Sequence, residues 1–89
     1  MKAIVTVTGK DKTGIIAGVS AALSACGVNI LDISQTVLQD YFAMFMLVDL
    51  ESSDVPFAEL SSCLEQTAKS MCMDIRIMRE EIFDAMHRI

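Results

Sequence analysis

Residues 29–50 read NILDISQTVLQDYFAMFMLVDL, and this stretch decides the fold. Its first half alternates apolar with polar side chains, Leu31, Ile33 and Val37 against Asp32, Ser34 and Thr36. A period of two is typical of a half-buried strand. Gln39 and Asp40 can then form a tight turn, after which residues 41–50 continue as a second apolar strand. The stretch therefore predicts a β-hairpin.

The residues before the hairpin predict one strand and one helix. Residues 2–8 are rich in β-branched side chains and end at Gly9. Residues 14–27 place apolar side chains at intervals of three and four, the spacing of a helix face: Ile15, Ile16, Val19, Leu23 and Cys26. Thr13 is available as the N-cap of this helix, and Gly27 is placed to end it.

The residues after the hairpin predict a helix, a strand and a tail. Pro56 suits the first turn of a helix, and the following residues carry one apolar stripe, formed by Phe57, Leu60, Leu64, Ala68 and Met71. Residues 74–79 alternate again, and residues 80–89 return to helical spacing with Ile82, Phe83, Met86 and Ile89. We expect a domain over residues 1–79 and a C-terminal amphipathic helical extension over residues 80–89.

The resulting order is βαββαβ followed by the tail. Crossover connections between strands are right-handed and hairpin strands are neighbours, so this order restricts the topology. It predicts an antiparallel sheet with the strand order 4-1-3-2 and both helices on one face. The expected fold class is α+β, a ferredoxin-like sandwich.

The second hairpin strand is apolar on both of its faces: Phe42, Met44, Met46 and Val48 on one, and Tyr41, Ala43, Phe45 and Leu47 on the other. Two helices can cover only one face, so we expect another subunit or residues 80–89 to cover the second. The helix over residues 14–27 also lacks charged residues, which indicates close approach by another element, or else an ordinary alanine-rich surface. Together these observations predict a homodimer.

Composition excludes several classes of partner. The 89 residues are 53% hydrophobic and carry a formal net charge of −5. Nucleic acid and anionic membranes need a basic face, so neither is an expected partner. The longest apolar run is residues 41–48, whereas a membrane-spanning helix needs about 20 residues. With no secretory segment and three cysteines that lack C-x-x-C spacing, the sequence predicts a cytoplasmic protein whose cysteines are reduced and buried.

The loop Gly9-Lys10-Asp11-Lys12-Thr13-Gly14 offers binding chemistry. Backbone N–H groups at the start of the following helix, together with the helix dipole, attract a carboxylate. Asp11 can receive an ammonium group, and Asn29 can supply one donor and one acceptor. A zwitterionic amino acid carries both charges, and we expect it where Asp11, Lys12, Thr13 and Gly14 meet Asn29. The alternative is a tight turn with a helix cap and no ligand.

The sequence resembles the ACT domain family in two motifs, Val7-Thr8-Gly9-Lys10-Asp11-Lys12-Thr13-Gly14-Ile15 and Gly27-Val28-Asn29-Ile30. Its tail, Ile82-Phe83-Asp84-Ala85-Met86-His87-Arg88-Ile89, is similar to that of small stand-alone ACT proteins of prokaryotes. The resemblance implies a regulatory module that dimerises and binds an amino acid near an interface, with Asp11, Gly14, Ile15, Asn29 and Ile30 at the site. Amino-acid-binding members often have Asn in place of Asp11 and Pro in place of Thr13.

Other chemistry is sparse. His87 shares a helical face with Glu80 and Asp84, but a solvated acidic tail is the simpler interpretation, and no metal is expected. No histidine stands near a nucleophile and no phosphate loop is present, so we expect no catalytic residue, no cofactor and no enzyme. The sequence predicts a regulatory domain that senses an amino acid or similar metabolite and signals to a partner protein. The alternative is a ligand-free protein–protein interaction module that acts through its dimer surfaces.

Overall fold

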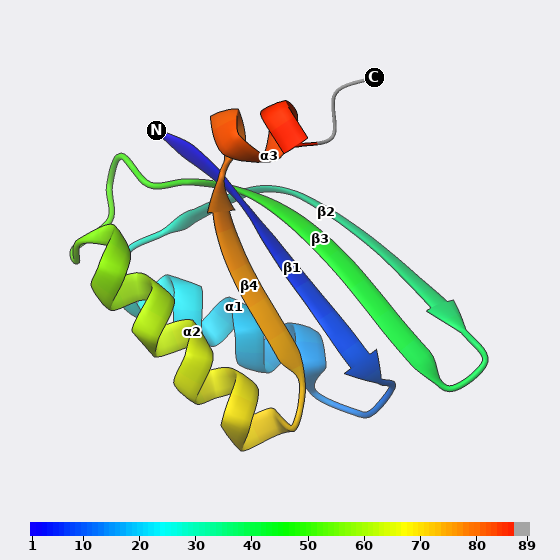
Figure 1. Ribbon diagram of the computed structural model, residues 1–89. Coiled ribbons are helices and arrows are strands. Elements are labelled where there is room, and N and C mark those ends of the chain that lie inside the picture. Colours follow the sequence, from blue (N-terminus) through cyan, green and yellow to red (C-terminus); the bar gives the residue numbers. More distant parts are fainter. Residues whose placement is uncertain (87–89) are drawn as a thin grey trace.

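The computed structural model describes residues 1–86, which form one antiparallel sheet with two helices on one face and a short third helix (Figure 1). The elements along the chain are β1 (Lys2–Lys10), α1 (Ile15–Ala25), β2 (Asn29–Leu38), β3 (Tyr41–Asp49), α2 (Phe57–Met71), β4 (Asp74–Arg79) and α3 (Glu80–Met86). The sheet has the order β2-β3-β1-β4. This is the predicted order, and the βαββαβ ferredoxin-like fold is confirmed.

The core lies between the sheet and the helices α1 and α2. Alternate strand residues point into it and are buried: Ala3, Val5, Val7, Phe42, Met44, Met46, Val48 and Ile75. From the helices, Ile15, Val19, Leu23, Leu60 and Leu64 complete this core. The opposite sheet surface, which we call the open face, carries the intervening residues Ile4, Thr6, Tyr41, Ala43, Phe45 and Leu47. The prediction that β3 is apolar on both faces is confirmed.

Both ends of α1 depend on glycine, but the residue that caps the N-terminal end is not the one that the sequence predicted. The N-cap is Gly14 rather than Thr13, and it has φ 88° with no side-chain cap hydrogen bond. The expected Thr13 cap is wrong because the loop enters the helix through a left-handed residue, which favours glycine. At the other end, Gly27 has φ 73°, and the Val28 amide donates to the Leu23 carbonyl at 3.0 Å. Gly27 therefore ends α1 as predicted.

The hairpin turn at Gln39 and Asp40 forms as expected, with φ 55° at Gln39. The alternation along β2 differs from the expectation near its start, because the register shifts between Ile30 and Asp32. This bulge takes Leu31 out of the alternating pattern. Beyond it, Ile33 and Val37 stand opposite the core residues Met46 and Phe42, on the helix side of the sheet.

The tail forms α3, which contacts β1 and β4. Phe83 is half-buried, whereas Ile82 and Met86 are exposed, so α3 covers only part of the open face. The predicted helical residues 87–89, including His87 and Ile89, lie outside the described residues. No helix within residues 1–86 is long and apolar enough to cross a bilayer.

All three cysteines are free. Cys26 is buried and Cys63 is half-buried, but Cys72 is exposed, so the prediction of three buried thiols is wrong at that position. The reason is local. Cys72 is the C-cap of α2 with φ 56°, and the chain turns there at the surface before β4 begins.

Candidate functional site

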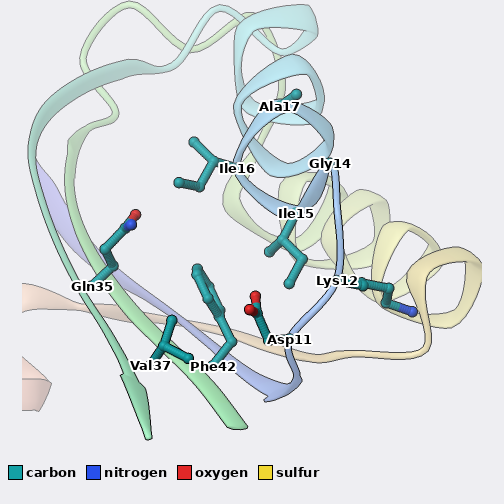
Figure 2. Close-up of a pocket in the computed structure, with 9 residues that line it drawn as sticks. All are labelled: Asp11, Lys12, Gly14, Ile15, Ile16, Ala17, Gln35, Val37 and Phe42. Atoms are coloured by element: carbon teal, nitrogen blue, oxygen red, sulfur yellow. The ribbon is translucent and has the colours of Figure 1, made fainter. Parts of the chain in front are cut away.

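A cleft of about 430 Å³ opens where the first turn of α1 faces the hairpin ends of β2 and β3 (Figure 2). It is lined by Asp11, Lys12, Gly14, Ile15, Ile16, Ala17, Gln35, Val37 and Phe42. The cleft exists because β2 and β3 are longer than the helix layer that covers them. Val37 lies opposite Phe42 in the sheet and stays half exposed, because no helix packs over it.

The cleft joins apolar walls to a few polar groups. Phe42 and Ile15 are buried at its base, and Ile16 and Val37 stand exposed on its two sides. Figure 2 shows the Asp11 carboxylate pointing into the space between Phe42 and Ile15, and the Gln35 carboxamide pointing in from β2. The Lys12 side chain points away from the other lining residues in the same view. Asp11 therefore supplies the inward-facing charge.

Backbone N–H groups add a second polar feature. The Gly18 amide donates to the Gly14 carbonyl at 2.9 Å, which is the first hydrogen bond of α1. In an α-helix the N–H groups ahead of that bond have no partner within the helix. Together with the helix dipole they favour an anion. Gly14 has no side chain and no side-chain cap is formed, so no capping side chain occupies these donors beside the cleft.

The loop before α1 is fixed to the hairpin. The Asp11 amide donates to the Asp40 carbonyl at 2.7 Å, which joins the loop to the turn between β2 and β3. At the neighbouring position, Lys10 pairs with Tyr41 in the sheet. Asp11 is thereby held at the mouth of the cleft, although its side chain is exposed.

The structure brings together only part of the predicted site. Asp11, Lys12, Gly14 and Ile15 line the cleft, and Thr13 lies exposed in the same loop without lining it. The remaining two predicted residues, Asn29 and Ile30, are far away, and the expected meeting of Asn29 with the loop is wrong within one chain.

Two features of the sheet separate Asn29 from the loop. β3 lies between β1 and β2, so β2 does not adjoin β1. Asn29 also pairs with Asp49, which pairs with Lys2, at the opposite end of β1 from Lys10. The eight-residue rise along β1 places these ends about 26 Å apart.

Comparison with known proteins identifies the family. A family model described as "ACT domain" matches residues 2–78. The chain belongs to the ACT domain family. ACT domains are regulatory ligand-binding modules, and the residues matched contain the whole cleft.

Full-length relatives of this ACT domain are found in bacteria and archaea. The UPF0237 protein of Clostridium acetobutylicum is 52% identical over 89 residues, covering 100% of both chains. The UPF0237 protein of Methanopyrus kandleri is 46% identical over 88 residues, covering 99% of this chain and 98% of the relative. A solved structure, the ACT domain protein from Streptococcus pneumoniae, is 44% identical with a TM-score of 0.82 and covers 94% of each chain. The chain is thus similar to small ACT proteins over its full length.

The sequence did not predict five of the nine residues that line the cleft of this ACT domain. Ile16, Ala17, Gln35, Val37 and Phe42 were not assigned to a site, yet all five line it. The hairpin register contains the signal for three of them. A two-residue turn at Gln39 and Asp40 places Val37 opposite Phe42, and Gln35 on the same side two residues earlier.

The described residues offer little metal chemistry. Within residues 1–86 no group of three or more His, Cys, Asp or Glu side chains is arranged to hold a metal ion. The weaker alternative of a metal bound by Glu80, Asp84 and His87 depends on His87, outside that range.

Proposed function

We propose that this ACT domain is a non-catalytic sensor that binds an amino acid or a similar small metabolite in the cleft beside Gly14. The single observation that carries the proposal is that the cleft has polar groups on one part of its lining and an apolar surface on the other. Its polar groups, Asp11, Gln35 and the first N–H groups of α1, lie beside an apolar surface formed by Ile16, Val37 and Phe42. A free amino acid has the same division between its two charged groups and its side chain.

The chemistry assigns an orientation to such a ligand. The α-carboxylate would lie at the N–H groups of α1, where the helix dipole favours negative charge. The ammonium group would lie at Asp11, and an apolar ligand side chain would pack on Val37 and Phe42. Charge-assisted hydrogen bonds contribute roughly 1.5 to 3 kcal/mol each. Three of them, after the cost of association, correspond to micromolar to millimolar affinity.

We further propose that the chain is a homodimer through the side of the molecule that carries α1 and β2. The outer residues of α1 are small and uncharged, and Ala17, Ala21, Ser24 and Ala25 are exposed. Ile33 and Val37 of the adjacent β2 are also exposed. A second copy placed there would border the cleft. Asn29 and Ile30 would then take part in binding only if the second copy supplies them.

Calorimetry with the free amino acids tests the ligand proposal. The intact chain is expected to bind at least one of them, and Ala17→Leu should weaken that binding at least tenfold because the larger side chain fills the cleft. Ala58→Leu is the matched control, since Ala58 is an exposed alanine in the first turn of α2, away from the cleft. Equal affinities for the two variants, or binding to none of the amino acids, would refute the proposed site.

A second candidate function is a ligand-free interaction module for a regulated protein. It is favoured by the large apolar side chains exposed outside the cleft, Leu38, Tyr41 and Phe45 among them. Thermal unfolding distinguishes the two functions. A ligand at 100 times its dissociation constant adds about 2.7 kcal/mol to the free energy of unfolding, whereas an interaction module gains nothing from any metabolite.

A further inference from the structure

We propose that the cleft selects an amino acid whose side chain ends in an uncharged carboxamide, and that Gln35 is the residue that recognises this end. The inference rests on the proposed function, because it assigns a class of ligand to the same cleft. Gln35 lines the cleft from β2, and Figure 2 shows its carboxamide pointing inward. A carboxamide offers two donors and an acceptor without carrying a charge. Gln35 is therefore suited to a neutral polar group of the ligand.

Gln35 and Asp11 are the two polar side chains directed into the cleft. Lys12, the other lining residue with a polar side chain, points away in Figure 2. Within residues 1–86 neither the Gln35 carboxamide nor the Asp11 carboxylate forms a hydrogen bond or an ion pair with another protein group. Both side chains are therefore available to one ligand at the same time.

The spacing between these two side chains sets the length of the ligand. Figure 2 shows the Phe42 ring between the Asp11 carboxylate and the Gln35 carboxamide. Phe42 pairs with Val37 in the sheet, and Gln35 lies two residues away along β2, about 7 Å further from the hairpin turn. In asparagine and glutamine four or five bonds separate the ammonium nitrogen from the amide group, roughly 5 to 6 Å in an extended side chain. Such a ligand reaches both residues while its methylene carbons pack on Phe42.

Charge favours the neutral carboxamide over a side-chain carboxylate of the same shape. Asp11 supplies the charge that faces into the cleft, and the chain carries −5 overall, so a second negative group on the ligand is repelled. A side-chain ammonium group gains no carboxylate at Gln35, because Asp11 is occupied by the α-ammonium group. Two carboxamides, by contrast, can form a pair of N–H···O hydrogen bonds, one in each direction.

An apolar side chain of similar length is expected to bind more weakly. It would displace water from the Gln35 carboxamide without replacing the hydrogen bonds, which is how a polar site discriminates against an apolar analogue. Gln35 is exposed, so part of its hydration persists and the discrimination is moderate. We expect a difference of about tenfold in affinity.

Calorimetry with matched amino acids tests the inference. Glutamine, glutamate and methionine are similar in length and differ in the end group, and asparagine, aspartate and leucine form a second, shorter set. In at least one set the intact chain is expected to bind the amide about tenfold more tightly than the other two members. Gln35→Leu should weaken binding of the amide about tenfold, while the apolar member binds at least as well as before. The preference for the amide should therefore disappear.

Gln66→Leu is the matched control, because Gln66 is exposed on α2, away from the cleft, and this variant should keep the preference. Circular dichroism verifies that both variants are folded. Equal weakening of every ligand by Gln35→Leu would place Gln35 at the part that all amino acids share, and would overturn the specificity. If the intact chain binds amino acids but prefers the amide in neither set, the role of Gln35 is wrong while the proposed function stands. Binding of no amino acid would refute both.

Discussion

Asp54 folds directly over Gly27. The Asp54 amide donates to the Cys26 carbonyl at 2.8 Å, and a Cβ atom on Gly27 would lie only 2.7 Å from Asp54 Oδ2. The Ser52 carbonyl oxygen would be 2.9 Å from the same Cβ, and the Ser52 hydroxyl donates to the Gly27 carbonyl at 3.0 Å. The turn that ends α1 is therefore packed against the loop that leads into α2.

Gly27→Ala should destabilise the fold markedly. The left-handed backbone costs roughly 1 to 2 kcal/mol for a residue with a side chain, and the crowding against Ser52 and Asp54 adds about 1 to 3 kcal/mol. Gly14→Ala is the control, because Gly14 also has positive φ but its Cβ would meet nothing within 4 Å. Urea unfolding should show the larger loss for Gly27→Ala. Equal losses would mean that the Asp54 contact contributes nothing.

Asp11→Asn tests the proposed orientation of the ligand. If the ammonium group lies at Asp11, removing the carboxylate charge should weaken amino-acid binding by about tenfold, since a charged hydrogen bond becomes a neutral one. Calorimetry at low and high salt provides the measurement, and the loss should be larger at low salt. Stronger binding by the variant would instead place the ligand carboxylate beside residue 11.

Asn29→Ala tests the contribution of a second copy. One chain cannot bring Asn29 to its own cleft, because β3 lies between the strands and the residue is at the far end of the sheet. We expect a loss of about two- to tenfold in ligand affinity at concentrations where the chain is dimeric, and none where it is dissociated. The same loss at every concentration would contradict this arrangement.

Cys26 should make stability fall at alkaline pH. Burial and a hydrogen bond with the neighbouring Cys63 thiol raise the pKa of Cys26 above its ordinary value. Above about pH 8.5 the unfolded chain releases this proton while the folded chain retains it, so the free energy of unfolding decreases as pH rises. The slope from this group is at most about 1.4 kcal/mol per pH unit.

The pH dependence of Cys26→Ala provides the check. Its stability is expected to decline less steeply between pH 8 and 10 than that of the intact chain, whatever its stability at pH 7. Cys72→Ala serves as the comparison because Cys72 is an exposed thiol, and its pH slope should match that of the intact chain. A steep slope retained by Cys26→Ala would exclude Cys26 as its source.

Local patterns in the sequence predicted most of the fold. Three of these patterns each reflect a preference that acts over a few residues. They are the alternation in residues 29–50, the helical spacing of Ile15, Val19 and Leu23, and the glycine at position 27 that ends the helix. In this protein these local preferences agree with the tertiary packing. Because crossover connections between strands are right-handed, only one strand order then fits the predicted elements. The bulge at Leu31 was not predictable, because an extra residue in an edge strand leaves no distinct period.

The candidate site was only half predictable for a related reason. Asp11 and Gly14 are close in sequence to the start of α1. The sequence therefore shows that a carboxylate and the first N–H groups of the helix lie in one loop. Gln35 and Phe42 reach the cleft through strand register, which depends on the exact turn. The placement of Asn29 beside the loop is inconsistent with the predicted strand order itself, which already puts β3 between β1 and β2, and the register puts Asn29 at the opposite end of the sheet.

The hydrogen bond from the Asp11 amide to the Asp40 carbonyl gives the cleft a mechanical property. It fastens the loop before α1 to the tip of the hairpin. The same turn joins the adjacent ends of β2 and β3. Those ends include Leu38 and Tyr41, on the opposite surface of the sheet. The loop that borders the cleft on one side of the sheet is thereby hydrogen-bonded to the turn that carries two exposed apolar side chains of the other side.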